Sequence, residues 1–173
     1  MHLKAAGAEA LVLCANTAHA VADRLEAHVD LPVINIATAT AIEIRKRQLG
    51  RVGLLGTKFT MELPFYRDKL LLHDIEAIIP PEQETRDFIQ LTLKEELGRG
   101  ITTDATRSAY LEIIDRLVAR GAEGIVLGCT ELPLLLTPAD VAVPVFDTTR
   151  IHANAAVEWA LSGSGVVAAC RSR

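Results

Sequence analysis

Cysteine is scarce in this sequence, and long apolar runs are absent. The 173 residues include three cysteines and no CxxC pair, which favours free thiols in a reducing compartment over a disulfide framework. No apolar stretch reaches the ~18–20 residues that a membrane-spanning helix needs. The N-terminus also lacks the charged and then apolar layout of a signal peptide. We therefore expect a cytoplasmic protein with no membrane partner.

Clusters of positive charge are absent as well. The formal net charge is −4, and no window collects the run of Lys and Arg that binding to a phosphate backbone requires. We therefore expect no nucleic-acid partner. Hydrophobic residues make up 50% of the chain and charged residues 23%, a balance typical of one compact unit or of two small lobes that share a core.

The sequence repeats itself once. The segment GAEALVL at residues 7–13 returns as GAEGIVL at residues 121–127, and the two copies are identical at five of seven positions. A cysteine follows each copy, Cys14 directly and Cys129 after one additional glycine. The copies begin 114 residues apart, at residues 7 and 121. This spacing is too long for a solenoid and indicates a duplicated α/β lobe.

Each copy predicts a buried strand that ends near a cysteine. Gly-Ala-Glu before a short run of Leu and Val is typical of a helix end followed by a parallel strand. Open α/β sheets bind ligands at the carboxyl ends of their strands, where both thiols would lie. We predict an α/β fold of two pseudo-symmetric parallel-sheet lobes with the active cleft between them. One lobe joins residues 1–45 with 143–173, and the other comprises residues 46–142.

Strands and helices are predicted to alternate along the rest of the chain. A polar turn over Thr57 to Thr60 is expected after the first central strand. The predicted strands span residues 51–56, 75–79 and 143–146, and the predicted helices span residues 21–27, 65–72, 84–97, 105–120 and 151–161. The helix over 105–120 is the clearest, because its apolar residues follow the i, i+3, i+4 spacing and Thr103 or Asp104 can cap its start.

The first copy of the repeat lies unusually close to the N-terminus. Gly121 is preceded by a predicted helix of about four turns, whereas only six residues precede Gly7. The first lobe is therefore expected to be incomplete at its N-terminus. A lobe without its opening strand–helix–strand unit would expose a sheet edge and an apolar face.

Four motifs resemble those of the aspartate/glutamate racemase family and occur in the same order along the chain. CANTAH at 14–19 and GCTE at 128–131 are similar to the two cysteine motifs of the family. GTKFTM at 56–61 is similar to its central glycine-threonine turn, and FDTTRIHA at 146–153 to its closing motif. The family's opening strand and Gly-Gly-Met-Ser-type loop have no counterpart, so the chain resembles an N-terminally truncated member.

The resemblance implies a cofactor-independent racemase that inverts the α-carbon of aspartate, glutamate or a related amino acid. Cys14 and Cys129 would be the catalytic pair: one thiolate removes the α-proton on one face, and the other thiol delivers a proton on the opposite face. The resemblance implies no metal or other cofactor, and it allows a homodimer. The positions that carry over as neutral donors for the substrate carboxylate are Asn16, Thr17, Thr57, Thr60 and Thr130.

Simpler interpretations exist for several polar residues. Asn16 and Thr17 would also suit the turn and cap of the helix predicted over 21–27. His19 and His152 are expected to orient loops by hydrogen bonds rather than to tune a thiolate.

Other residues near the cysteines are expected to be structural. A carboxylate beside a thiol raises the thiol pKa, which favours for Glu131 and Asp147 a structural role or a supporting role behind the residues that contact the substrate. Cys170, in the polar tail, is expected to have no catalytic role. A metal site is disfavoured, because Cys14 and Cys129 are far apart in sequence and have no paired ligand at short spacing.

Three alternative functions stay open. A related enzyme of the hydantoin racemase, maleate isomerase or malonate decarboxylase type would use the same two thiols. A non-catalytic truncated domain would bind a small carboxylate or a partner chain without turnover. A redox sensor would form a reversible disulfide between Cys14 and Cys129. For a racemase, the side-chain carboxylate of the substrate needs a cationic partner, which could be Lys58, Arg86 or a residue of an N-terminal segment.

Overall fold

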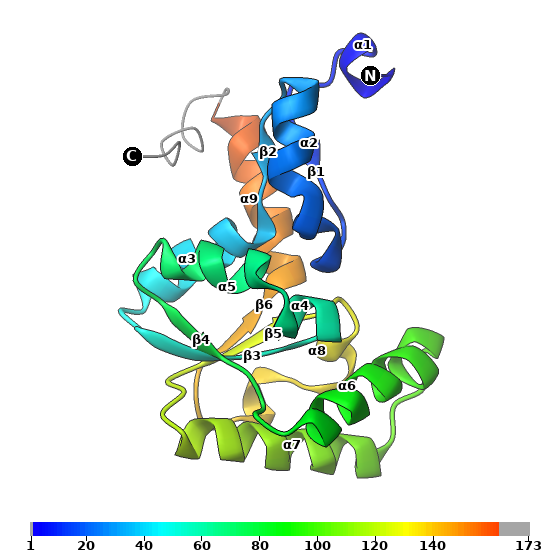
Figure 1. The fold of residues 1–173 in the computed structure, drawn as a ribbon, viewed down its shortest axis with the longest axis vertical. Coiled ribbons are helices and arrows are strands. Elements are labelled where there is room, and N and C mark those ends of the chain that lie inside the picture. The colour runs from blue at the N-terminus through cyan, green and yellow to red at the C-terminus, as the bar shows by residue number, and fades with distance from the viewer. Residues whose placement is uncertain (1, 163–173) are drawn as a thin grey trace.

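Two parallel β-sheets organise the chain in the computed structural model, which describes residues 2–162 (Figure 1). The strands are β1 (Leu11–Val12), β2 (Val33–Ile34), β3 (Arg51–Gly56), β4 (Glu76–Ile78), β5 (Ile125–Gly128) and β6 (Val145–Asp147). The larger sheet has the order β4-β3-β5-β6, and the smaller sheet consists of β1 and β2. All of these pairings are parallel. The predicted α/β fold with parallel strands is therefore confirmed.

Helices connect the strands. The α-helices are α1 (His2–Ala5), α2 (Ala22–Val29), α3 (Ile36–Lys46), α4 (Lys58–Glu62), α5 (Pro64–Leu71), α6 (Gln83–Glu95), α7 (Asp104–Ala119), α8 (Leu132–Leu135) and α9 (Thr148–Leu161). Short 3₁₀ turns are η1 (Thr17–Val21), η2 (Leu97–Arg99) and η3 (Pro138–Asp140). The helices predicted over 65–72, 84–97 and 105–120 correspond to α5, α6 and α7. Thr103 caps α7 as predicted, because its hydroxyl accepts from the Thr106 N–H at 3.0 Å.

Three segments differ from the sequence prediction because polar side chains start helices there. The polar turn expected over Thr57 to Thr60 is the start of α4, since the Thr57 hydroxyl accepts from the Thr60 N–H. α3 has no counterpart among the predicted helices and is capped by Asn35. α9 begins at residue 148 rather than 151, because Asp147 accepts from the two backbone N–H groups after Thr148.

The larger sheet is covered by helices on both faces, as Figure 1 shows. Leu55, Ile125 and Leu127 are buried on one face in a cluster with α6 and α7. Leu54 and Val126 are buried on the other face in a cluster with α3 and α5. Neighbouring strand residues point to opposite faces, so a central strand with two covered faces must be apolar along its length. This is why β3 and β5 are the clearest apolar runs in the sequence.

The two central strands end together at a pair of glycines. Gly56 of β3 is in register with Gly128 of β5. A Cβ atom at Gly56 would lie 2.7 Å from the Gly128 carbonyl oxygen, so a side chain there would collide with the neighbouring backbone. The residues that follow, Thr57 and Cys129, therefore leave adjacent strands at the same carboxyl edge of the sheet.

The repeated segment folds in the same way in both copies. Gly7 and Gly121 have positive φ values of 89° and 93°. They follow the ends of α1 and α7, and each donates its N–H to the carbonyl three residues earlier. At the start of the next strand, Leu11 and Ile125 each donate to the carbonyl of the proline before the neighbouring strand. The duplication is therefore visible in the backbone hydrogen bonds.

The two copies differ in the number of neighbouring strands that pair with their own strand. β5 pairs with β3, and Glu123 in the turn before β5 accepts from the N–H groups of Gly50 and Arg51 at 2.8 and 3.0 Å. β1 pairs only with β2 among the described residues, and the corresponding Glu9 is exposed. The first copy is therefore held by fewer backbone contacts than the second.

The C-terminal elements connect the two sheets. β6 pairs with β5 in the larger sheet, although the predicted division at residue 143 assigns it to the first lobe. α9 then runs from β6 along α3 and reaches β2 of the smaller sheet (Figure 1). The division of the chain at residues 46 and 143 stays a prediction. Within residues 2–162, no helix is both long enough and apolar enough to cross a bilayer.

Candidate functional site

The carboxyl edge of the larger sheet carries polar residues from three neighbouring strands. Thr57 follows β3, Cys129 follows β5 and Thr148 follows β6, and these strands are adjacent and parallel. Strand ends of this kind form the ligand-binding edge of open α/β sheets. The first copy of the repeat contributes the loop after β1, which carries Cys14 and the residues next to it.

Three threonine hydroxyls, one from the loop after β1 and two from the segment after β3, form one cluster. The Thr17 oxygen lies 2.9 Å from the Thr57 oxygen and 3.1 Å from the Thr60 oxygen, and the last two are 3.1 Å apart. Thr60 is fully buried. Each hydroxyl has one proton and can rotate it, so the cluster can turn donors toward an anion without moving the backbone. Three of the predicted binding residues therefore lie together.

Asn16 connects the Cys14 loop to the strand that leads to Cys129. Its amide nitrogen donates to the Thr148 hydroxyl at 3.0 Å, and this hydroxyl donates to the Leu127 carbonyl at 2.8 Å. The orientation of the Asn16 amide follows, because the single Thr148 proton is used on Leu127 and Thr148 can only accept from its other partner. A path of two hydrogen bonds thus joins Asn16, two residues after Cys14, to Leu127, two residues before Cys129.

The remaining polar atom of Asn16 is an acceptor without a donor. Asn16 is 4% exposed, and its Oδ1 has no hydrogen-bond partner among the described residues. A buried acceptor without a donor costs ~1–3 kcal/mol. Asn16 therefore keeps one acceptor that no donor of the described residues uses.

The two motif cysteines have different surroundings. Cys14 is exposed, and its sulfur lies 3.9 Å from the Val12 carbonyl oxygen. Cys129 is half-buried, and its thiol donates to the Glu131 carboxylate at 2.8 Å. Thr130, which lies between Cys129 and Glu131 in sequence, is exposed. Cys170 lies outside the described residues.

Glu131 and Cys129 shift each other's ionisation. Burial, followed by the hydrogen bond to Glu131, raises the pKa of the Cys129 thiol to about 12. Burial alone would raise the pKa of Glu131, but hydrogen bonds from Cys129 and from the Thr130 side chain outweigh it and lower this pKa below its usual value. The pair therefore holds one proton on sulfur and a negative charge on the carboxylate.

Both buried histidines are engaged with the loops that follow β1 and β2. His19 Nε2 accepts from the Ile36 N–H at 3.2 Å, so its Nδ1 carries the proton that is donated to the Ala15 carbonyl at 2.9 Å. His152 Nε2 lies 2.6 Å from the Ile34 carbonyl oxygen, to which it donates. Burial lowers the pKa of both rings, so both are neutral near pH 7. These contacts agree with the expected loop-orienting role.

The two candidate cations for a substrate side chain already hold carboxylates. Lys58 Nζ lies 2.6 Å from Asp87, and Arg86 Nε lies 2.9 Å from Glu62. Arg86 also donates to the carbonyls of Pro80 and Pro81. Either cation would have to exchange its partner before it could bind a substrate carboxylate.

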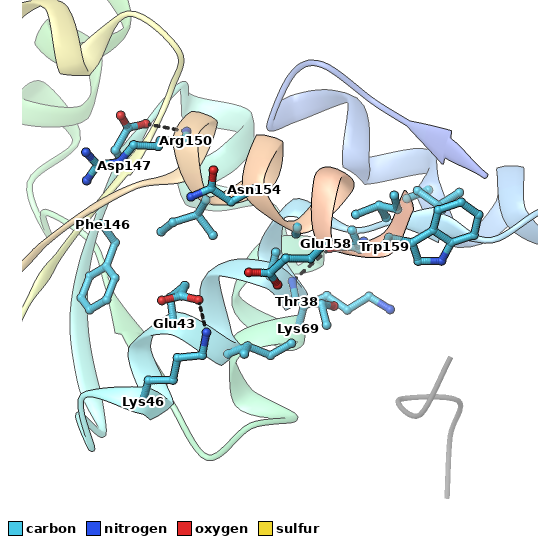
Figure 2. A pocket seen from close by; sticks show the side chains of 18 of the residues that line it. Thr38, Glu43, Lys46, Lys69, Phe146, Asp147, Arg150, Asn154, Glu158 and Trp159 are labelled. Atoms are coloured by element: carbon cyan, nitrogen blue, oxygen red, sulfur yellow. Dashed lines mark hydrogen bonds and ion pairs between the residues drawn. The ribbon is translucent and has the colours of Figure 1, made fainter. Parts of the chain in front are cut away.

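One broad hollow among the described residues lies away from the cysteines. It encloses about 1190 Å³ between α2, α3 and α9, beside β2 and β6. Figure 2 shows its mixed lining, which includes the ion pair of Glu43 and Lys46 at 2.6 Å and the indole of Trp159. It contains neither Cys14 nor Cys129. Its size does not make it the reactive site, because no cysteine or histidine is among the residues that line it.

A metal site does not emerge from the described part of the chain. Within residues 2–162, no group of three or more His, Cys, Asp or Glu side chains gathers closely enough to hold a metal ion.

The sequence matches a known family over most of its length. A family model described as Asp/Glu/Hydantoin racemase matches residues 1–156. The chain belongs to this family. Among solved structures, a Yersinia pestis protein assigned to the Asp/Glu racemases is 48% identical with a TM-score of 0.87, over 92% of this chain and 70% of that one. An aspartate racemase homologue from Pyrococcus horikoshii is 37% identical with a TM-score of 0.82, over the same shares.

The match to a full-length glutamate racemase covers less than half of that protein. A glutamate racemase from Streptococcus pneumoniae is 31% identical over 128 residues, which are 72% of this chain and 46% of that protein. The chain thus spans about half the length of that racemase. The family that the four motifs indicated is confirmed.

One member of the site was not singled out from the sequence, and another was expected to have a structural or supporting role. Thr148 was part of a motif but was not singled out, although it follows a strand end as Thr57 does. Glu131 was expected to have a structural or supporting role, and it contacts the Cys129 thiol directly. Position after a strand end was the available signal for Thr148, and the GCTE motif was the available signal for Glu131.

Proposed function

We propose that this protein is a cofactor-independent amino-acid racemase for aspartate, glutamate or a related amino acid, with Cys14 and Cys129 as its acid/base pair. The observation that carries this proposal is the path from Asn16 through Thr148 to Leu127, which ties the loop of one cysteine to the strand of the other. Membership of the racemase family supports the same activity.

The reaction needs a base on one face of the α-carbon and an acid on the other. One thiolate takes the α-proton, and the electron pair of the broken C–H bond spreads onto the α-carboxylate. The second thiol then gives its proton to the opposite face of the carbon. No electrons leave the substrate, and the two sulfurs exchange protonation states in each turnover.

The polar groups of the site suit the two ends of an amino acid. The α-ammonium would donate to the Asn16 Oδ1, which has no other donor among the described residues. The α-carboxylate would accept from the hydroxyls of Thr17, Thr57 and Thr60, which already form one cluster. These donors strengthen as negative charge builds on the carboxylate, so they stabilise the carbanion more than the bound substrate.

The cell compartment follows from the same chemistry. Both thiols must be reduced for proton transfer, so we propose that the protein acts in the cytoplasm. Its partner would be the amino-acid substrate, and a homodimer stays a prediction.

Solvent deuterium incorporation tests this function. The full chain would be incubated in D₂O with L- and D-aspartate and with L- and D-glutamate, and the α-proton followed by NMR while chiral chromatography measures inversion. We expect exchange and inversion with at least one of these pairs. Cys170→Ser should retain both, as a control for the loss of a thiol outside the pair. A folded protein that exchanges none of the four substrates would contradict the proposal.

A further inference from the structure

Glu131 is the one carboxylate among the described residues that is hydrogen-bonded to a motif cysteine. Its Oε2 lies 2.8 Å from the Cys129 sulfur and accepts the thiol proton. Glu131 is itself half-buried, so the charge is only partly screened by water. The first copy of the repeat has no such contact among the described residues, where the hydrogen-bond partner of the Cys14 thiol is the Val12 carbonyl at 3.9 Å.

Cys129 packs against the apolar cluster that contains Tyr110 of α7. This phenol is neutral, because burial raises its pKa above the usual range. The Tyr110 hydroxyl lies 2.9 Å from the Thr92 hydroxyl and 3.4 Å from the Ile89 carbonyl oxygen. Among the described residues, no lysine or arginine forms an ion pair with Glu131. The negative charge of Glu131 is therefore uncompensated at this sulfur.

A thiol that donates to a buried carboxylate is a poor source of thiolate. Loss of its proton would place two negative charges within hydrogen-bonding distance in a partly desolvated site. The same contact fixes the sulfur in one position, which a proton donor requires. Both effects favour the protonated form of Cys129.

The geometry points to Glu131 as a positioning residue that keeps Cys129 in its thiol form, so that Cys129 is the proton donor and Cys14 the proton acceptor of the resting protein. This inference rests on the proposed racemase function. In the first half-reaction the Cα–H bond breaks and an S–H bond forms at Cys14. The Cys129 S–H bond then breaks as its proton moves to Cα. Exchange with water afterwards returns a proton to Cys129 and removes one from Cys14.

This asymmetry does not favour one enantiomer in kcat/KM. The equilibrium constant of a racemisation is one, so kcat/KM must be equal in both directions at every pH. The asymmetry appears instead in how each thiol ionises and in how the shared kcat/KM depends on pH. The readout therefore has to be the thiol itself and the pH profile.

Alkylation of single thiols by iodoacetamide tests the inference without any need for turnover. In a Cys14→Ser, Cys170→Ser background, Cys129 is the one remaining thiol of the three in the chain. In this background Glu131→Gln should raise the alkylation rate at pH 8 about 3- to 10-fold, because a larger thiolate fraction is partly offset by lower nucleophilicity. Glu112→Gln is the control, because it removes an exposed carboxylate of α7 and not the one bonded to Cys129; it should leave the alkylation rate unchanged.

The pH profile of racemisation supplies the second readout, in the chain with all its thiols. Between pH 8 and pH 10, the ratio of the kcat/KM of Glu131→Gln to that of the wild type should fall about threefold, because Cys129 loses its proton in the variant. Glu131→Asp, which keeps the charge, should restore the wild-type profile in part. Racemisation with unchanged alkylation and unchanged pH profile in Glu131→Gln would overturn the inference and leave the proposed function standing.

A failure of the proposed racemase function can be distinguished from a failure of the inference about Glu131. If the wild type does not racemise but Glu131→Gln still accelerates alkylation, the control of Cys129 by Glu131 holds and the racemase proposal fails. If Glu131→Gln does not fold, the thiolate absorbance of the Cys14→Ser, Cys170→Ser protein decides. Cys129 should then titrate above about pH 10, and titration near ~8.5 would overturn the inference.

Discussion

The two copies of the repeat present the same residues in different surroundings. Cys129, which follows β5, is half-buried and hydrogen-bonded to Glu131, and β5 has a paired strand on each side. After β1, Cys14 is exposed, and its strand pairs on one side only among the described residues. The second copy is therefore the rigid half of the proposed site and the first copy the more open half.

This difference teaches how a duplicated unit can acquire two roles. A symmetric pair of thiols would have equal tendencies to give and to take a proton. Burial and a single carboxylate distinguish Cys129 from Cys14, although both thiols follow strands of the repeated segment. The backbone repeat thus positions the two sulfurs, and the neighbouring side chains decide what each one does.

Removal of each thiol should give the largest effect and separate the two roles. Cys14→Ser should abolish both inversion and α-proton exchange, because the remaining Cys129 is held as a thiol. Cys129→Ser should lower inversion by about 10³-fold or more yet retain exchange with one enantiomer, because Cys14 can still act as a base. NMR in D₂O with chiral chromatography measures both. Equal loss of exchange in the two variants would break the comparison.

The two sheets should also differ in stability. Leu54 is fully buried between β3 and its helices, and Leu54→Ala should cost about 2–5 kcal/mol of unfolding free energy. Val12 is 42% exposed on β1, and Val12→Ala should cost less than about 1 kcal/mol. Urea unfolding followed by circular dichroism gives both values. Similar costs at the two positions would show that the smaller sheet is as well packed as the larger one.

Asn16 should matter more than any polar residue of the large hollow. Asn16→Ala removes the acceptor proposed for the α-ammonium and the bond to Thr148, so kcat/KM should fall about 10- to 100-fold. Asn154→Ala is the matched control, because this exposed residue of α9 lines the hollow in Figure 2. The kcat/KM of Asn154→Ala, measured by steady-state kinetics, should stay within about twofold of the wild-type value. The reverse ranking would move the substrate site into the hollow.

The smallest effect should come from the glutamates of the repeated Gly-Ala-Glu. Glu123→Gln should lower the melting temperature, because its carboxylate accepts from the Gly50 and Arg51 N–H groups, whereas Glu9→Gln should leave it unchanged. These two hydrogen bonds lower the pKa of Glu123 below its ordinary value of 4.5.

The pH dependence of this effect has a definite sign. A lowered folded-state pKa means that Glu123 stabilises the fold above pH 4.5 and that this stability is lost as the pH falls through the folded pKa. The difference in melting temperature between wild type and Glu123→Gln should therefore narrow in acid, as scanning calorimetry from pH 6 to pH 3 would reveal. A difference that stays constant with pH would mean that the Glu123 charge is not involved.

The elements of the larger sheet were largely predictable from local sequence. Strands such as 51–56 and 125–128 are apolar because both of their faces are covered, and this requirement is written in consecutive residues. The helix over 105–120 was equally clear, since one apolar face repeats over four turns and Thr103 caps it. By contrast, α3 was missed and α4 was taken for a turn, because their starts depend on the side chains of Asn35 and Thr57 capping the backbone.

The sequence by itself determined that two cysteines follow duplicated strands, that threonines surround them, and that the chain belongs with the racemases. Only the tertiary structure decided which side chains meet: Asn16 and Thr148 are 132 residues apart, and Thr17 reaches Thr57 across 40. Strand ends are specified by local apolar patterns, whereas contacts between loops depend on how sheets and helices pack. The bond between Cys129 and Glu131 spans two residues, yet the burial that gives it its strength comes from the packed core around it.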